Sequence, residues 1–293
     1  MDLPTSQLAT LLAIVEHGTF DAAARALSLT PSAVSQRVRA LEGAVGRVVV
    51  QRTTPCVPTA AGEVLVRLAR QHALLAAEVA AELGGSGAAV ELPVGVNADS
   101  LATWFADVVA EAAGWDRVAL RLSVEDQGWS SDLLRRGEVL GVVTSDSTPV
   151  QGCRVTPLGA MRYRPAATPT LADRWRRGRG PDWTRMPVVV FNKKDALQHD
   201  ALAARGVEPA VVHRVPTSHD FLAAVRSGLG WGMLPEQQLL PGLDDGTLIR
   251  LGGPHVDVPL HWMRWRLASP ALDRFGEAVT GVAARSLRRL RTG

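Results

Sequence analysis

Polar side chains that can hydrogen-bond nucleic acid lie at helical spacing near the N-terminus. Four of them fall at i, i+3, i+4 and i+7, on one face of a helix: Ser32, Ser35, Gln36 and Arg39. Serine, glutamine and arginine can hydrogen-bond base edges and phosphate oxygens. Arg37 flanks this face and is better placed for a phosphate. The spacing therefore predicts a helix face that contacts DNA.

The elements that would position this face form a helix-turn-helix. Apolar residues at positions 8, 11, 12 and 15 give one face to a helix from about Thr5 to His17. A second short helix is expected over residues 20–27. Thr30 can cap a third helix and Pro31 suits its first position, because proline lacks the N–H that would be unpaired there. We expect this third helix, with a core face of Val34, Val38 and Leu41, to enter the major groove.

Charge supports DNA binding only locally. The formal net charge is +3, and residues 1–85 carry seven arginines and seven acids. Within residues 25–52, however, five arginines accompany one acid, Glu42. The alternative is a small helical bundle with a solvated face, which does not explain why the segment from Ser32 to Arg39 lacks acids.

A β-rich stretch, a turn at Thr54-Pro55 and a return follow the third helix, which predicts a wing near the DNA backbone. The candidate DNA-binding residues are Arg25, Thr30, Pro31, Ser32, Ser35, Gln36, Arg37, Arg39, Arg52 and Thr53. The next segment, residues 61–87, is a predicted linker helix ending in a GGSG hinge. Its heptad-like spacing of Leu65, Leu68, His72, Leu75 and Val79 favours a dimer seam, the alternative being packing on the chain's own second domain.

From Glu91 onward strands alternate with helices, which indicates α/β units in two halves with a cleft between them. Ligands of such folds bind beyond the carboxyl ends of strands, where several polar residues occur. The candidate effector-binding residues are Asn97, Asp99, Ser100, Trp104, Glu125, Asp126, Thr144, Asp146, Asp195 and Ser218. Hydroxyl and N–H groups suit a carboxylate and the acids suit a cation, so a basic amino acid fits this set.

Composition excludes several other classes of protein. No apolar run approaches the roughly 20 residues of a membrane span, and the N-terminus does not resemble a secretory signal, so we expect a cytoplasmic protein. Cys56 and Cys153 lack metal-like spacing and are expected to be buried thiols. No catalytic motif is found, so we expect neither an enzyme, nor a metal site, nor a cofactor.

Residues 20–63, FDAAARALSLTPSAVSQRVRALEGAVGRVVVQRTTPCVPTAAGE, closely resemble the N-terminal domain of LysR-type transcriptional regulators. Further along, VNADSLATWF, EDQ, RRGEVLG and GLGWGMLP look like the lysine/arginine-responsive ArgP/LysG branch of that family. The chain departs mildly from the family pattern at Val38 and at Val50-Gln51. The resemblance covers almost the whole chain.

The resemblance implies an α+β multidomain fold. It would comprise a winged helix-turn-helix (1–60), a linker helix and hinge (61–87), and an α/β periplasmic-binding-protein-like effector domain (88–293). Subdomain I would be about 91–163 with 267–293, and subdomain II about 164–266. It also implies that the chain binds promoter DNA as a homodimer or tetramer, with RNA polymerase as a further candidate partner and no membrane. The effector would be lysine, arginine or histidine, and the target gene an exporter of basic amino acids.

Two other functions compete with this interpretation. A LysR-type regulator could take a different small molecule, and a solute-binding transport protein would share the α/β halves. The helix-turn-helix and the absence of a signal-like N-terminus argue against transport. Deleting residues 1–60 separates these classes, because a regulator would lose promoter binding and keep ligand binding.

Overall fold

The computed structural model describes residues 2–84, 89–125, 130–192, 196–253 and 255–289. The chain forms two compact units, each assembled from separate stretches of sequence. Unit 1 comprises Met1–Val96, Ala112–Thr156 and Trp262–Ala278, and unit 2 comprises Asn97–Glu111, Pro157–His261 and Val279–Gly293. Each unit contains buried apolar clusters of its own.

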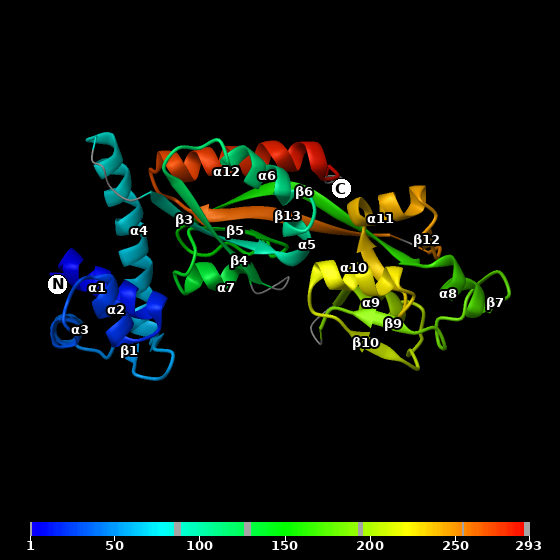
Figure 1. The fold of residues 1–293 in the computed structure, drawn as a ribbon, viewed down its shortest axis with the longest axis horizontal. Helices are drawn as coiled ribbons and strands as arrows, with labels where there is room; N and C mark the ends of the chain where they lie inside the picture. Colours follow the sequence, from blue (N-terminus) through cyan, green and yellow to red (C-terminus); the bar gives the residue numbers. More distant parts are fainter. Residues whose placement is uncertain (1, 85–88, 126–129, 193–195, 254, 290–293) are drawn as a thin grey trace. The chain divides into compact units, whose positions relative to one another are not determined.

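Unit 1 begins with three helices and a short antiparallel ribbon (Figure 1). The elements are α1 (Thr5–His17), α2 (Phe20–Ala26), α3 (Pro31–Val45), β1 (Val50–Gln51) and β2 (Val57–Pro58). Thr30 caps α3, since its hydroxyl accepts a hydrogen bond from the Ala33 N–H at 3.2 Å. Gly18 ends α1 with φ +74°, a left-handed conformation that suits glycine. These bounds confirm the predicted winged helix-turn-helix.

The ribbon is held closely against the start of α4 (Ala60–Glu82). Thr59 caps this helix and also donates from its hydroxyl to the Val48 carbonyl at 2.7 Å. A Cβ atom at Gly62 would lie 1.9 Å from the Val49 carbonyl oxygen, so only glycine permits this approach. The sequence TTPCVPTAAGE thus fixes both the wing and the entry to the linker helix.

Polar contacts also join α4 to the α/β part of unit 1. The Arg70 guanidinium is buried, donating to the Gly137 carbonyl at 2.6 Å and to the Glu16 carboxylate at 2.7 Å. Arg67 donates to the Arg135 carbonyl at 3.1 Å. Near the far end of α4, the Glu78 carboxylate accepts a hydrogen bond from the Ser269 hydroxyl at 2.7 Å. The helix therefore packs on its own chain, as the alternative interpretation of the linker predicted.

An apolar stripe of α4 nevertheless remains exposed. Leu65 is 6% exposed and lies in the core of the helix-turn-helix together with buried residues of α1, so its assignment to the dimer seam is wrong. The exposed apolar residues of the stripe are Val64, Leu68, Leu75 and Val79. His72 is exposed along the same line. Two faces of one helix thus serve different purposes, because Leu65 and Leu74 are buried while this stripe is not.

The α/β part of unit 1 has the strand order β13-β5-β3-β4. Its elements are β3 (Val90–Asn97), β4 (Val118–Glu125), α7 (Ser130–Arg135), β5 (Gly141–Thr144), the end of β13 (Val256–Trp265) and the start of α12 (Pro270–Ser286). Strands β3 and β5 are parallel, with Val94 opposite Gly141, as strand–helix alternation predicted. A Cβ atom at Gly141 would lie 2.3 Å from the Trp262 ring, so only glycine leaves room for the indole here.

Unit 2 holds the remaining elements, although the first four residues of β6 belong to unit 1. They are α5 (Ala98–Leu101), α6 (Phe105–Ala112), β6 (Cys153–Ala167), α8 (Pro169–Arg174), β7 (Arg176–Arg177), β8 (Gly180–Pro181), β9 (Val188–Val190), α9 (Ala196–Ala203), β10 (Val212–Arg214), α10 (Ser218–Arg226), β11 (Gly232–Pro235), α11 (Glu236–Asp244) and β12 (Ile249–Arg250). Strands β9 and β10 are parallel, with Val188 opposite Val212. Strands β11 and β12 both run antiparallel to β6. Sequence analysis did not identify β6, because its 15 residues mix apolar and arginine side chains.

Candidate functional site

Helix α3 separates its two faces as the spacing predicted. Val34, Val38 and Leu41 are fully buried in the core of the helix-turn-helix. Ser32, Gln36 and Arg39 are exposed, and Ser35 is half-buried. The one acid of this helix, Glu42, is occupied, because its carboxylate accepts a hydrogen bond from the Val49 N–H at 3.0 Å. The polar face can therefore meet an anionic surface without a competing carboxylate.

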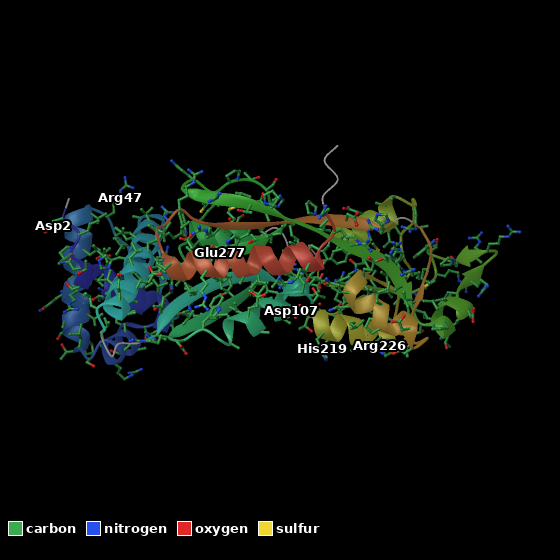
Figure 2. The ribbon with its side chains drawn as sticks, turned by 90° about the horizontal axis from the view of Figure 1, so that it is seen from above. Asp2, Arg47, Asp107, His219, Arg226 and Glu277 are labelled. Carbon is green, nitrogen blue, oxygen red and sulfur yellow. The ribbon has the colours of Figure 1, made fainter. Side chains whose placement is uncertain are left out.

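The other predicted DNA-binding residues differ in how exposed they are and in whether they contact other parts of the domain. Arg25 and Pro31 are exposed, as is Arg47, which Figure 2 labels. The Arg52 guanidinium lies over the Phe20 ring at 4.7 Å, and the Thr53 hydroxyl donates to the Pro55 carbonyl at 2.7 Å, so both shape the wing. Arg37 is half-buried and donates to the buried Thr10 hydroxyl at 3.5 Å, which directs its guanidinium toward α1.

A polar cluster in unit 2 gathers five of the predicted effector residues: Asn97, Asp99, Ser100, Trp104 and Ser218. The Asp99 carboxylate accepts a hydrogen bond from the Ser218 hydroxyl at 2.7 Å, across 119 positions of sequence. Its other oxygen accepts from the Tyr163 hydroxyl at 2.8 Å. Gln238 in turn donates to the Ser218 hydroxyl at 3.2 Å. The cluster therefore centres on one carboxylate held by two hydroxyls.

Burial raises the pKa of the Asp99 carboxyl, and the hydrogen bonds from Ser218 and Tyr163 only partly oppose this. The residue keeps some solvent exposure, but protein atoms surround its carboxyl group. No guanidinium or other cation contributes to its pKa shift. An approaching cation would favour the ionised form of this group.

Four polar atoms of residues within five positions of Asp99 are buried and have no hydrogen-bond partner among the described residues. They are the Asn97 Oδ1 and Nδ2 atoms, the Ser100 hydroxyl oxygen and the Trp104 Nε1 atom. Leaving such a group unpaired costs about 1–3 kcal/mol, so buried polar groups normally have partners. The donors suit a carboxylate, while Asp99 and Asn97 Oδ1 suit an ammonium. Together they match the two charges of an amino acid.

A second group of predicted residues lies in unit 1. The Thr144 hydroxyl is buried and accepts a hydrogen bond from the Asp146 N–H at 3.0 Å. The Asp146 carboxylate accepts from the Thr148 N–H at 2.8 Å and from the Ser131 hydroxyl at 3.1 Å. Burial opposes ionisation of Asp146, but these hydrogen bonds and the Arg135 charge outweigh it and lower its pKa. Most of its acceptor capacity is thus used within the chain.

The side chains of the remaining three predicted effector residues lie outside the described part of the structure. Glu125 ends β4, and its side chain is outside the description. Asp126 and Asp195 also lie outside the described residues. Tyr163, Gln238 and Ser131 were missed by sequence analysis. Tyr163 is the one tyrosine of the chain, but nothing in its spacing connects it with Asp99.

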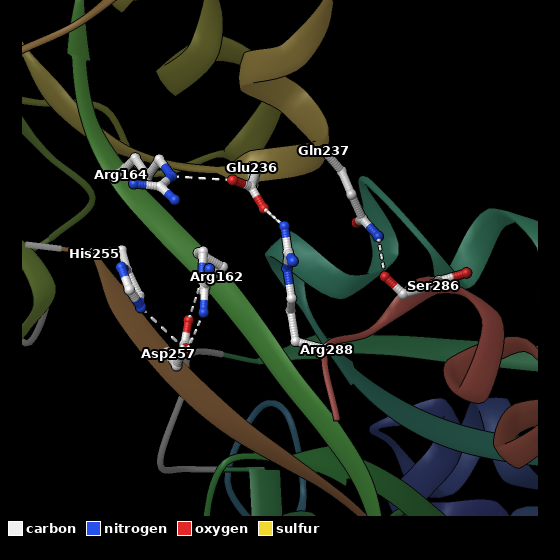
Figure 3. A network of polar contacts seen from close by, with 8 residues as sticks. All are labelled: Arg162, Arg164, Glu236, Gln237, His255, Asp257, Ser286 and Arg288. Atoms are coloured by element: carbon white, nitrogen blue, oxygen red, sulfur yellow. Dashed lines mark hydrogen bonds and ion pairs between the residues drawn. The ribbon is translucent and has the colours of Figure 1, made fainter. Parts of the chain in front are cut away.

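Arginines of β6 form a separate network with α11, β13 and the segment after α12 (Figure 3). Arg162 makes a bidentate pair with Asp257, with both distances 2.7 Å. Glu236 accepts from Arg164 at 3.0 Å and from Arg288 at 2.5 Å. Arg162 lowers the pKa of Asp257. Each carboxylate here already has a cation, so the network holds elements together and offers no free ligand site.

The burial of the two cysteines agrees with the sequence analysis. Cys56 and Cys153 are buried free thiols, and burial raises the pKa of Cys153 to about 12. The described part of the chain contains no cluster of three metal-ligating side chains. None of its helices is long and apolar enough to cross a membrane.

Comparison with known proteins matches two family models. Residues 5–63 match the model of the bacterial regulatory helix-turn-helix protein, lysR family, and residues 85–284 match the LysR substrate binding domain. The chain is 50% identical to the lysine export transcriptional regulatory protein LysG of Corynebacterium efficiens, covering 96% of this chain and 98% of LysG. These matches confirm the predicted resemblance, and the relatives are transcriptional regulators and not enzymes.

Two solved structures are similar along their whole length. Full-length LysG from Corynebacterium glutamicum, with arginine bound as its effector, has a TM-score of 0.81 and 47% identity. It covers 98% of this chain and 100% of its own. ArgP from Mycobacterium tuberculosis has a TM-score of 0.87 and 44% identity, covering 99% and 100%. Both support the predicted order of a helix-turn-helix domain followed by a mixed α/β domain.

Proposed function

We propose that this chain, which belongs to the LysR family of bacterial regulatory helix-turn-helix proteins, is a transcriptional regulator that responds to a basic amino acid. The observation that carries an amino-acid effector is the buried Asp99 carboxylate, together with four unpaired polar atoms of Asn97, Ser100 and Trp104. The relative LysG from Corynebacterium glutamicum binds arginine as its effector, which supports this ligand class. We expect lysine, arginine or histidine to bind, and expect the target gene to encode an exporter of basic amino acids.

DNA recognition is assigned to the polar face of α3. Ser32, Gln36 and Arg39 are exposed on a helix whose opposite face forms the domain core. In helix-turn-helix proteins the corresponding helix enters the major groove and contacts base edges. Arg25 and Arg52 then lie on neighbouring elements, where phosphate contacts would orient the domain.

Ligand recognition is assigned to the cluster in unit 2. The ligand's ammonium group would pair with Asp99 and Asn97 Oδ1. Its carboxylate would accept hydrogen bonds from Ser100, from Trp104 and from Asn97 Nδ2. A cation beside Asp99 offsets the cost of ionising a carboxyl group whose pKa burial has raised. Glu125, Asp126 and Asp146, the predicted acids of unit 1, stay predictions from the sequence.

The exposed stripe of α4 supports a homodimer. Val64, Leu68, Leu75 and Val79 are between 37 and 55% exposed, at spacings of 4, 7 and 4 along the helix. Such a stripe buries itself against a second helix in a coiled-coil-like seam. From the same linker we infer a DNA-binding domain at 1–60, a linker at 61–87 and an effector domain at 88–293. Assembly into a tetramer and contact with RNA polymerase are further expectations.

Calorimetry with lysine, arginine, histidine and leucine tests the effector assignment. We expect heat of binding only from the three basic amino acids. Asp99→Asn should weaken lysine binding at least about 10-fold, since a charged hydrogen bond contributes about 1.5–3 kcal/mol. Asp200→Asn, an exposed acid of the same unit, is the matched control and should leave binding unchanged. Equal heats from leucine and lysine would instead favour a LysR-type regulator with a different effector.

A further inference from the structure

A strongly basic segment of unit 2 plays no part in the sites described above. Residues 173–185, DRWRRGRGPDWTR, carry five arginines and two aspartates, a net charge of +3. The whole chain also has a formal charge of +3, so the rest of the chain is balanced. Residues 1–85, with the helix-turn-helix, have seven arginines and seven acids. The excess positive charge of this protein therefore resides in this segment, which we name the arginine hairpin.

The arginine hairpin presents its charges on a tight turn. Strands β7 and β8 pair with Arg177 opposite Gly180, which leaves a two-residue loop of Gly178 and Arg179 (Figure 1). Gly178 has φ +59°, and such loops favour glycine at their first position. The Asp182 N–H donates to the Trp175 carbonyl at 2.7 Å and closes the base. Arg177 and Arg179 are thus held at an ordered, exposed tip.

Tryptophans support the base of the arginine hairpin. The guanidinium carbons of Arg174 and Arg185 each lie 5.4 Å from the centre of the Trp175 ring. Trp183 packs edge-on against the buried Trp231 with ring centres 4.8 Å apart. Stacking on a ring restricts a guanidinium and leaves its N–H groups free for an external acceptor. The ring faces are accordingly covered by charge and offer little apolar surface to a protein partner.

Most of these cations lack an internal carboxylate. Arg176 pairs with Asp173. Within the described residues, the other four arginines of the hairpin form no ion pair: Arg174, Arg177, Arg179 and Arg185. All four are exposed. Four exposed guanidinium groups without a carboxylate partner would bind a molecule with several closely spaced negative charges.

We propose that the arginine hairpin binds the phosphate backbone of double-stranded DNA, independently of sequence and in addition to α3. The proposal rests on the DNA-binding function proposed above. Guanidinium groups match phosphate oxygens in geometry, and phosphate contacts supply most of the sequence-independent affinity of DNA-binding proteins. Residues 1–85, the helix-turn-helix with its linker helix, have no net charge. The hairpin would add phosphate contacts to those that we assign to Arg25 and Arg52.

The test measures affinity of the full-length protein for a mixed-sequence duplex of about 60 base pairs between about 50 and 200 mM salt. Each lost phosphate contact reduces the slope of log K against log salt by about 0.9. For Arg177→Gln/Arg179→Gln we expect a slope smaller by about 1.8, which is about a 12-fold smaller loss of affinity over this range. Both positions are at an exposed tip, so the thermal unfolding midpoint should match that of the parent.

The matched control is Arg214→Gln/Arg250→Gln, which removes two exposed arginines elsewhere in unit 2. An unchanged slope in this control supports a local contact, whereas equal changes in both variants would show an effect of total charge and overturn the proposal. An unchanged slope in the hairpin variant, with parent binding intact, overturns the hairpin proposal alone. Poly-glutamate serves as a second probe, which represents acidic protein surfaces. If Arg177→Gln/Arg179→Gln loses binding to poly-glutamate and keeps the parent's DNA binding, the hairpin would be assigned to acidic protein surfaces instead. A parent that binds no duplex would contradict both proposals.

Discussion

The ion pair between Arg70 and Glu16 offers the sharpest prediction about stability. The Arg70 side chain is 8% exposed and the Glu16 side chain 27% exposed. Burial lowers the pKa of Arg70, and the Glu16 carboxylate opposes that shift. Glu16 also lies 3.6 Å from Arg121. Replacing Glu16 by glutamine therefore leaves a buried guanidinium without its counter-charge and near a second cation.

The magnitude follows from the burial of the two groups. Breaking a buried ion pair by removing one partner costs about 3–5 kcal/mol. Glu16 is partly solvated and glutamine can still accept a hydrogen bond from Arg70, so we expect about 2 kcal/mol for Glu16→Gln. Arg70 also donates to the Gly137 carbonyl, a contact that this substitution leaves in place.

Amide hydrogen exchange of peptides from α1 and α4 measures this local stability. A loss of about 2 kcal/mol corresponds to exchange about 30-fold faster. Glu82→Gln, which changes an exposed acid at the end of α4, is the control and should change exchange little. In a double-mutant cycle with Arg70→Met, we expect a coupling of about 1–3 kcal/mol. Coupling near zero, with Glu16→Gln equal to its control, would refute the reasoning.

Three further predictions concern DNA binding, charge and assembly. Arg39→Ala or Gln36→Ala should reduce the preference for operator over non-operator DNA by about 1–3 kcal/mol in competition binding, and an unchanged preference would reject the assigned face. Arg162→Gln should raise the pKa of Asp257. Because Arg162 lowers the pKa of Asp257 in the folded state, the pair stabilises that state above the ordinary aspartate pKa of 3.8, and the effect fades as pH falls through the lower folded pKa. In urea unfolding the variant should lose at most about 1 kcal/mol at neutral pH and less at acid pH. Leu75→Glu should convert a dimer into a monomer by light scattering, whereas Glu63→Gln on the same helix should not.

The N-terminal domain could be predicted closely because its signals are local. Threonine caps, glycine stops and apolar spacing act within one or two helical turns: α1 ends at Gly18 and α3 begins after Thr30, as predicted. The wing strands β1 and β2 also lie on either side of the predicted turn at Thr54-Pro55. Leu65 was misassigned for a related reason: heptad spacing identifies an apolar stripe, but not whether the chain itself or a second copy covers it.

The ligand cluster could be predicted only in part, because it depends on contacts between distant segments. Asn97, Asp99 and Ser100 follow a strand, which is a local signal, and Ser218 starts a helix. The hydrogen bond between Ser218 and Asp99 depends on the tertiary structure, and residue spacing in the sequence does not predict it. Tyr163 was missed because it lies within β6, whose antiparallel pairing with β11 departs from the alternating strand–helix pattern.

The structure also separates acids that the sequence treats alike. Asp146, Glu236 and Asp257 each have N–H or guanidinium partners, and their pKa values are lowered. Asp99 has only hydroxyl partners, and burial raises its pKa. A cation is therefore the missing partner of Asp99, and binding of that cation should favour ionisation of the Asp99 carboxyl group.

It follows that a basic amino acid should release protons as it binds and should bind more tightly as pH rises through the pKa of Asp99 in the ligand-free protein. Calorimetry in buffers of different ionisation enthalpy measures this release, and Asp99→Asn should abolish it while Asp200→Asn should not. Equal proton release in all three proteins would mean that Asp99 does not meet the ligand.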